Sequence, residues 1–396
     1  MGTDPFTRCS ETSKYMFDPT EEMVAPDNTD KYYGQIGDSR NQLVLFIDYC
    51  QAFSDEAETR TDQVFVGIDY EFNNRQIAVM QLAFERAPGK DNHLWALNPA
   101  ELDKRQTNIL INRLMRNRKI FKILHGADSL DIPYMFKHLF KDNKDTIADF
   151  MSRFIDTRFM CEFGRVITNK ERRCNIYNGL LQYNTIDQEK NEQLHQNHDE
   201  MGPVQNISWN IHKMTIPTIK YALYDVIFLR RFMLDIARYI KNNKPSHYPF
   251  IKLFNRFTQF IILEKKGATD VLLTAKQEVD PVNNFMFQYR GKKMTLIAGY
   301  QQLITGFKIP SIGLYIDDLM MIPFFRAQIS MLMKRIIYAV LMENHQVYEN
   351  RLTPTKRDLR FSKFMGQITN SHSLGIQKLV EMIHQQVISR HRRRFG

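Results

Sequence analysis

The sequence has no long hydrophobic run, and this absence excludes a chain anchored by a helical membrane span. No stretch of its 396 residues approaches the ~18 consecutive uncharged apolar residues that cross a bilayer. The chain also does not open with the charged, apolar and small-residue segments of a secretory signal. We therefore expect a soluble, intracellular protein with no membrane partner.

Cysteine is scarce, and its spacing excludes two common kinds of site. The four cysteines are scattered, with no C-x-x-C pair: Cys9, Cys50, Cys161 and Cys174. This spacing predicts neither a disulfide framework nor a zinc site. It is typical of a reducing compartment, although it does not distinguish nucleus, cytoplasm and mitochondrion.

Charge is distributed unevenly along the chain, whose formal net charge is +10. Residues 241–396 hold 24 Lys and Arg against 10 Asp and Glu, a balance of +14, whereas residues 1–240 hold 30 against 34, a balance of −4. This asymmetry indicates an acidic half that attracts metal ions, joined to a basic half that can hold a polyanion. The alternative is that the basic residues form an ordinary solvated surface.

The length of the chain predicts two domains, because 396 residues exceed the roughly 100–200 typical of one. Residues 1–7 resemble a cloning remnant, and residues 8–38 a polar arm. We expect an α/β domain over residues 39–241, with a polar insertion at about 170–206. A smaller, basic and mainly helical domain is expected over residues 246–396.

Hydrophobic periodicity predicts the order of elements in the first domain. The expected helices cover residues 41–53, 101–117, 129–140 and 215–240, and the expected strands cover 64–72, 76–84, 93–97, 120–124 and 155–157. The first three strands follow one another directly, which predicts an antiparallel meander. With helices between the later strands, the pattern indicates an α/β layered domain with a mixed sheet.

Two acids, Asp69 and Glu71, stand near the end of the strand expected over residues 64–72. Side chains alternate along a strand, so both point to one face, about 6–7 Å apart along the backbone. Two buried acids repel each other and cost several kcal/mol to desolvate unless something compensates them. A divalent cation is the natural compensation. The alternative is an exposed strand end with solvated acids.

Two later segments carry further acids. The sequence HGADSLD at 125–131 brings Asp128 and Asp131 from a strand end into the start of a helix. The sequence YALYD then places Tyr221 and Asp225 four residues apart, on one face of a helix.

In this order of motifs the sequence resembles the DEDDy 3′–5′ exonucleases, and within them ribonuclease D and the related exosome-associated exonuclease. The resemblance covers residues 40–240 and is carried by DYEF at 69–72, KILHGAD at 122–128, FIDT at 154–157 and YALYD at 221–225, with Trp209 twelve residues before Tyr221. It implies a ribonuclease-H-like fold, a mixed sheet flanked by helices. The histidine variant of the superfamily needs His at the position of Lys220, so the tyrosine class is favoured.

The resemblance also implies the catalytic residues. Asp69, Glu71, Asp131 and Asp225 would hold two Mg²⁺ or Mn²⁺ ions, for which carboxylate oxygens are suitable ligands. Tyr221 would help to position the attacking water. Two such ions activate a water and stabilise the leaving 3′ oxygen in an in-line displacement.

The second motif departs from the family pattern. Relatives usually carry the catalytic acid five residues after the histidine, whereas Asp131 is six residues after His125 and Asp128 only three. The residues after Asp131 match the family better, and Asp128 stays an alternative. His195 and His198, in the polar insertion, lack cysteines or acids at zinc-like spacing, so we expect them to be solvated loop residues.

The functional prediction is a metal-dependent 3′–5′ exoribonuclease that releases nucleoside 5′-monophosphates from the 3′ ends of single-stranded RNA. One alternative is an inactive exonuclease-like protein that binds RNA as a scaffold. Another is a 3′–5′ exonuclease that acts on DNA, which the absence of polymerase and helicase motifs disfavours.

The resemblance stops near residue 240, and the family's helical HRDC domain is not recognisable beyond it. Basic residues near aromatic ones in the C-terminal third are candidate nucleic-acid contacts: Arg290, Lys292, Lys293, Lys334 and Arg335. Such side chains neutralise phosphates and stack bases. The same third is a candidate surface for a protein partner.

Overall fold

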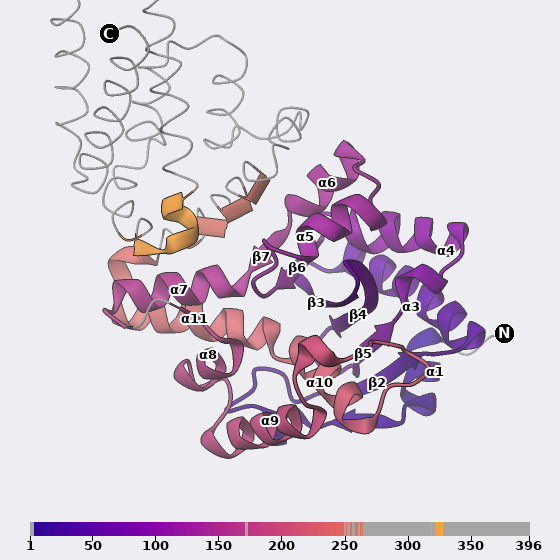
Figure 1. Ribbon diagram of the computed structural model, residues 1–396, viewed down its shortest axis with the longest axis horizontal. Coiled ribbons are helices and arrows are strands. Elements are labelled where there is room, and N and C mark those ends of the chain that lie inside the picture. Colours follow the sequence, from indigo (N-terminus) through magenta and orange to yellow (C-terminus); the bar gives the residue numbers. More distant parts are fainter. Residues whose placement is uncertain are drawn as a thin grey trace, which may run out of the picture. The chain divides into compact units, whose positions relative to one another are not determined.

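The computed structural model describes residues 4–170 and 173–248, together with 251, 254, 255, 258, 259, 262, 263, 318 and 321–327 (Figure 1). The chain divides into two compact units, Met1–Gly164 with Arg173–Gln259, and Arg165–Arg172 with Phe260–Gly396. The sheet and the site described below belong to the first unit. The five basic residues predicted to contact nucleic acid lie outside the described residues: Arg290, Lys292, Lys293, Lys334 and Arg335.

A seven-stranded mixed sheet forms the centre of the first unit. Its strands are β1 (Tyr15–Phe17), β2 (Tyr32–Gly37), β3 (Val64–Asn73), β4 (Gln76–Glu85), β5 (Asn92–Leu97), β6 (Ile120–Leu124) and β7 (Phe154–Asp156). They lie in the order β1-β2-β5-β4-β3-β6-β7. Strands β3, β4 and β5 form the predicted antiparallel meander, and β6 and β7 extend it in parallel from β3. This topology is ribonuclease-H-like, so the fold predicted for the first domain is confirmed. The smaller helical domain expected over residues 246–396 lies largely outside the described residues.

Helices precede the meander and connect or follow the later strands. They are α1 (Pro5–Thr12), α2 (Pro19–Glu22), α3 (Arg40–Thr59), α4 (Lys104–Ile109), α5 (Asp131–Tyr134), α6 (Lys144–Met151), α7 (Thr157–Ile167), α8 (Ile176–Gln182), α9 (Gln188–Met201), α10 (Ile216–Ile227) and α11 (Leu229–Asn243). The π-helical segments η2 (Leu110–Met115) and η3 (Met135–Leu139) continue α4 and α5, and η1 (Pro99–Glu101), η4 (Val204–Asn206) and η5 (Pro245–His247) are 3-10 turns. The single helix predicted over residues 215–240 is divided at Phe228. No helix among the described residues is both long and apolar enough to cross a membrane.

Alternation along β4 separates the two faces of the sheet. The ring of Phe84 packs against Phe53 of α3, with 5.0 Å between ring centroids, so α3 covers one face. Gln81 lies three residues earlier and therefore points to the opposite face, where α10 packs against β3, β4 and β5. The approach of α10 is close at Gly67 of β3, where an added Cβ would lie 2.8 Å from the Val226 carbonyl oxygen. Figure 1 shows α3 and α10 on different sides of these strands.

The N-terminal segment is more structured than the predicted polar arm. Strand β2 pairs in parallel with β5, and β1 pairs antiparallel with β2, so this segment widens the sheet. Phe6 of α1 is buried, 4.9 Å from the Tyr49 ring, with the Arg86 guanidinium 3.4 Å from its ring centroid. Strands of three and six residues are too short to give a clear hydrophobic alternation, which explains why the sequence did not reveal them.

Cys161 and Cys174 form a disulfide bond, which corrects the prediction that the cysteines do not pair. Cys161 lies in α7, and Cys174 lies 13 residues later, directly before the N-cap residue of α8, Asn175. The bond packs against Gly179 of α8, where a Cβ would lie 2.9 Å from Cys174 Sγ. Sequence spacing could not show this pairing, because it depends on how two helices pack.

Candidate active site

Three acids from two elements meet near the carboxyl end of β3. Asp69 and Glu71 lie on β3, and Asp225 lies on α10. Each offers a carboxylate oxygen, and the three oxygens lie within 4.8 Å of one another. Glu71 is only 7% exposed, whereas Asp69 and Asp225 are half-buried, so the cluster is partly accessible to solvent. The structure therefore brings together the strand acids and the late helical acid that the sequence singled out.

Asp131 lies beside this cluster but outside the group of three. It occupies the first position of α5 and is 8% exposed. The charge of Asp69 raises its pKa, and its own charge helps to raise the pKa of Glu71. Asp128 lies in the preceding turn, where its Oδ1 is 3.4 Å from Nη1 of Arg158. Of the two candidates in this segment, Asp131 is thus the one whose charge reaches the cluster.

Asp156 of β7 holds the turn that leads to Asp131. Its two carboxylate oxygens accept hydrogen bonds from the backbone N–H groups of Gly126 and Ala127, both at 3.0 Å. Gly126 has φ +73°, in the left-handed region that glycine adopts readily. Asp156 belongs to the FIDT motif, and its hydrogen bonds to the turn about 30 residues earlier explain why that motif contains an acid.

Burial and mutual repulsion make the ionised forms of these acids unfavourable. Burial raises the pKa of Asp69, Asp131 and Asp225, and the charge of Asp69 adds to the rise for the other two. The pKa of Glu71 is also raised, first by burial and then by repulsion from its three acidic neighbours. No described Lys or Arg forms an ion pair with any of the four, so a divalent cation is the charge that would compensate them.

Tyr221 lies one helical turn before Asp225, on the same face of α10. Repulsion from the Asp225 charge, followed by burial, raises the pKa of the Tyr221 phenol. The Tyr221 hydroxyl in turn opposes the rise in the pKa of Asp225. The phenol therefore stays protonated at neutral pH and can act as a hydrogen-bond donor beside the acids.

Trp209 packs near Tyr221, and its backbone is hydrogen-bonded to Asn73 at the end of β3. The Asn73 side-chain amide donates to the Trp209 carbonyl oxygen at 2.6 Å, and the Trp209 backbone N–H donates to Asn73 Oδ1 at 2.9 Å. The indole is 4% exposed, and its ring centroid lies 6.1 Å from that of Tyr221. The loop before α10 is thus tied to the strand that carries Asp69 and Glu71.

The polar insertion supplies aromatic groups that the sequence analysis assigned to solvent. It folds into α8 and α9, and His195 and His198 lie one turn apart on α9. The Tyr177 ring of α8 meets His195 at 5.4 Å, and the Tyr221 ring meets His198 at 5.9 Å. The prediction of solvated loop residues is therefore wrong for the half-buried His198, and the exposed His195 is helical. The three-residue spacing of the two histidines was the sequence signal that could have placed them on one face of a helix.

Tyr177 is a further group near the acids, and no sequence motif predicted it. Its side chain is buried, and its pKa is raised by burial and then by the charges of Asp225, Glu71 and Asp69. One face of α9, through His195 and His198, therefore contacts two tyrosines near the acids: Tyr177 from the insertion and Tyr221 from α10.

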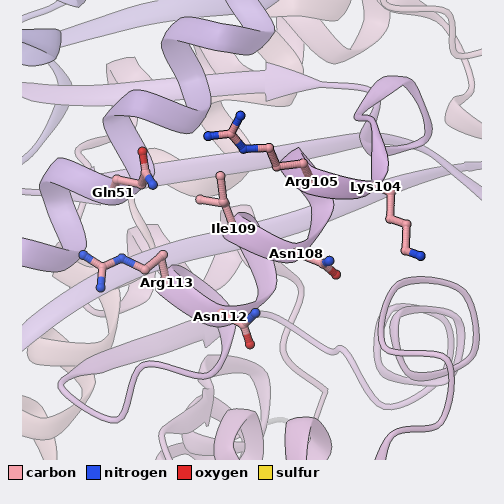
Figure 2. Close-up of a pocket in the computed structure, with 7 residues that line it drawn as sticks. All are labelled: Gln51, Lys104, Arg105, Asn108, Ile109, Asn112 and Arg113. Atoms are coloured by element: carbon pink, nitrogen blue, oxygen red, sulfur yellow. The ribbon is translucent and has the colours of Figure 1, made fainter.

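A cavity of about 630 Å³ lies on the other face of the sheet (Figure 2). It is lined by residues of α3, α4 and η2: Gln51, Lys104, Arg105, Asn108, Ile109, Asn112 and Arg113. Figure 2 shows Ile109 between Arg105 and Arg113, with Lys104 to one side and pointing away. A cavity lined by cations and amides, without an acid, would repel a divalent cation. The acid cluster under α10 is consequently the candidate metal site.

Comparison with known sequences gives one extensive match. No family model matches the chain. A protein of Acanthamoeba polyphaga mimivirus, described as uncharacterized protein L533, is 30% identical over an alignment of 365 residues, and the match covers 88% of this chain and 72% of the viral protein.

Comparison with solved structures gives exonuclease domains of low overall similarity. The Aedes aegypti Nibbler EXO domain is 14% identical, with a TM-score of 0.35, over 61% of this chain and 99% of that domain. Trypanosoma brucei RNase D in complex with GMP is 15% identical, with a TM-score of 0.36, over 65% and 62%. Brucella melitensis NrnC bound to pGG is 13% identical, with a TM-score of 0.32, over 56% and 91%. Because these scores are low, the fold assignment depends on the strand order of the protein's own sheet.

Proposed function

This chain belongs to the same family as the mimivirus protein, and we propose that it is a metal-dependent 3′–5′ exoribonuclease. The observation that carries the proposal is the convergence of Asp69, Glu71 and Asp225 within 4.8 Å, with Asp131 beside them and no compensating cation among the described residues. The order of motifs resembling the DEDDy exonucleases supports the same reading.

The donor set suits two Mg²⁺ or Mn²⁺ ions. Hard carboxylate oxygens are the ligands that such ions prefer, and burial raises the pKa values of Asp69 and Glu71, so their ionised forms need a compensating charge. When bound, two divalent ions activate a water and neutralise charge on the scissile phosphate. Asp69, Glu71, Asp131 and Asp225 would hold them.

The chain's own residues orient the reaction. The protonated Tyr221 hydroxyl can donate a hydrogen bond to the attacking water or to a phosphate oxygen next to Asp225. The rings of Trp209 and His198 limit the movement of the phenol. Hydrolysis breaks the bond between phosphorus and the 3′ oxygen of the penultimate nucleotide. The released nucleotide carries the 5′-phosphate, and the shortened strand ends in a new 3′-hydroxyl.

The test uses the full chain with 5′-labelled single-stranded RNA and Mn²⁺ or Mg²⁺. We expect a ladder of products shortened one nucleotide at a time, release of nucleoside 5′-monophosphates, and no reaction in EDTA. A circular RNA of the same sequence should stay intact because it has no 3′ end. A 5′-labelled DNA of the same sequence, run in parallel, measures the choice between RNA and DNA.

Two variants connect the activity with the acid cluster. Asp69→Asn combined with Asp225→Asn should lower the rate by at least ~1,000-fold, the size expected when about 4 kcal/mol of transition-state stabilisation is lost. Asp62→Asn, which removes a surface partner of Arg60, is the matched control and should be fully active. Cleavage of the circular RNA, or full activity in the double variant, would disprove the proposal. RNA binding that is equal with and without EDTA, together with no cleavage, would favour the scaffold alternative.

A further inference from the structure

Gln81 of β4 lies directly opposite Asp69 of β3 in the antiparallel register. Directly opposed residues of an antiparallel pair point to the same face of the sheet, and Glu71, two residues after Asp69, shares that face. A long side chain at position 81 reaches both its direct neighbour and its diagonal neighbour. Gln81 is therefore the residue of β4 that is best placed to contact the acid cluster.

The Gln81 side chain is fully buried, and its amide has no hydrogen-bond partner. Its exposed fraction is 0%, and neither Oε1 nor Nε2 forms a hydrogen bond with any residue that the structure describes. Buried amides in folded proteins are almost always paired, so an orphan of this kind indicates a partner that arrives with a ligand. The strand register places this amide opposite Asp69 and diagonal to Glu71, within reach of both carboxylates.

We propose that Gln81 is a positioning residue of the metal site. Its Nε2 group donates a hydrogen bond to the Glu71 carboxylate when that carboxylate is ionised, and so selects the oxygen that Glu71 offers to a divalent cation. Its Oε1 atom is then available to accept a hydrogen bond from a water at the site. The inference extends the proposed exonuclease function, although its test depends on cation binding and not on catalysis alone.

This role makes two predictions of opposite sign for replacement by Met, an apolar side chain of similar length. A buried amide without a partner destabilises the metal-free protein, so its removal should leave the melting temperature in EDTA unchanged or raise it. Loss of the group that orients a ligand should weaken cation binding by about 10- to 100-fold. If the Gln81 side chain only filled space, its replacement by Met would leave cation binding unchanged.

The experiment titrates Mn²⁺ into the full chain by calorimetry and measures the melting temperature in EDTA. The test variant is Gln81→Met. The matched control is Gln35→Met, which removes another fully buried glutamine of the same sheet, one whose amide donates to the Cys9 carbonyl oxygen. We expect Gln81→Met to bind Mn²⁺ more weakly, with its melting temperature in EDTA maintained. Gln35→Met should show the reverse, a lower melting temperature with unchanged Mn²⁺ affinity.

The activity of the same variants separates this inference from the proposed function. In Gln81→Met, the Mn²⁺ concentration for half-maximal RNA cleavage should rise by the same factor as the dissociation constant, with the maximal rate much less affected. If the wild type binds Mn²⁺ and Gln81→Met binds it equally well, the role of Gln81 is disproved while the exonuclease can stand. If Gln81→Met weakens binding but the wild type cleaves no RNA, the role of Gln81 stands and the exonuclease is disproved. A wild type that binds no Mn²⁺ disproves both.

Discussion

Arg158 reaches back from α7 to the turn before α5, where its Nη1 lies 3.4 Å from Oδ1 of Asp128. The same guanidinium bonds Glu162 through Nε at 3.1 Å. Asp128 thus forms an ion pair with Arg158, whereas the charge of Asp131 acts on Glu71. Two acids that the sequence left as alternatives therefore have different surroundings.

Replacing each of these two acids by the isosteric amide tests that difference. We expect Asp131→Asn to lower Mn²⁺ affinity and RNA cleavage by at least ~100-fold, because it removes charge beside the cluster. Asp128→Asn should retain Mn²⁺ affinity within about threefold. It should lose about 1–2 kcal/mol of unfolding free energy because it removes the ion pair with Arg158, and the loss is no larger because Arg158 is partly exposed and the pair is partly screened. Calorimetric titration and urea denaturation of both variants give the two numbers. The reverse order of Mn²⁺ affinities would assign the ligand to Asp128.

The arrangement of acids on β3 could be predicted from the sequence, because strand alternation is local and fixes Asp69 and Glu71 on one face. The four-residue spacing of Tyr221 and Asp225 is equally local. The order of strands 64–72, 76–84 and 93–97 followed from their short connections.

The groups that complete the site could not be predicted, because their positions depend on long-range pairing. Gln81 meets Asp69 only through the register between two strands, and a shift of one residue would point it to the other face. Asp156 meets the turn after β6 from 30 residues away. In α9 the pattern is almost entirely polar, since only a narrow face of that helix touches the protein, and the sequence therefore resembled a loop around His198.

The pH dependence of stability without metal should weaken when metal is added. The pKa of Asp69 is raised from 3.8 to about 7 and that of Glu71 from 4.5 to about 10. Between pH ~5 and 7 the folded protein therefore retains protons that the unfolded chain has released. The free energy of unfolding should fall as pH rises, by at most about 1.4 kcal/mol per pH unit for each retained proton, and by less where solvent reaches Asp69.

Urea denaturation in EDTA at several pH values measures this slope. Asp69→Asn should flatten it, since the amide does not titrate and also relieves repulsion on Glu71. Added Mn²⁺ should stabilise the wild type more at pH 7 than at pH 5, because cations bind the deprotonated carboxylates. Asp62→Asn serves as the surface control and should keep the wild-type slope. A stability in EDTA that rises over this range in the wild type and equally in Asp69→Asn would contradict the proposed origin of the effect.

The hydroxyl of Tyr221 should matter for catalysis and not for the fold. Tyr221→Phe removes the hydroxyl next to Asp225 and keeps the ring that packs near Trp209 and His198. We expect kcat to fall by about 100-fold, the typical effect of removing one positioned donor, with KM and the melting temperature nearly unchanged. Single-turnover cleavage of labelled RNA at saturating Mn²⁺ measures the rate.

Tyr224→Phe is the matched control for that variant. Tyr224 lies three residues further along α10, and its hydroxyl faces Glu22 at 3.4 Å. Loss of this hydroxyl should leave kcat at the wild-type value. Equal losses of kcat in the two variants would show that Tyr221 acts through the stability of α10, and an unchanged rate in Tyr221→Phe would remove it from the mechanism.

The Cys161–Cys174 bond should stabilise the part of the insertion that contacts the site. It closes a loop with a sequence separation of 13, for which the loss of unfolded-state entropy corresponds to about 3 kcal/mol. The bond also anchors the start of α8, and Tyr177 of that helix packs against His195. Cys161→Ala combined with Cys174→Ala should therefore lower the unfolding free energy by about 2–3 kcal/mol in urea.

A reducing agent should destabilise the wild type to the same level and have no effect on the double variant. Cys50→Ala, which replaces a buried unpaired cysteine, should stay sensitive to the reducing agent. If mass spectrometry of the native protein finds all four thiols reactive after unfolding without reductant, the bond does not form and no such difference should be seen.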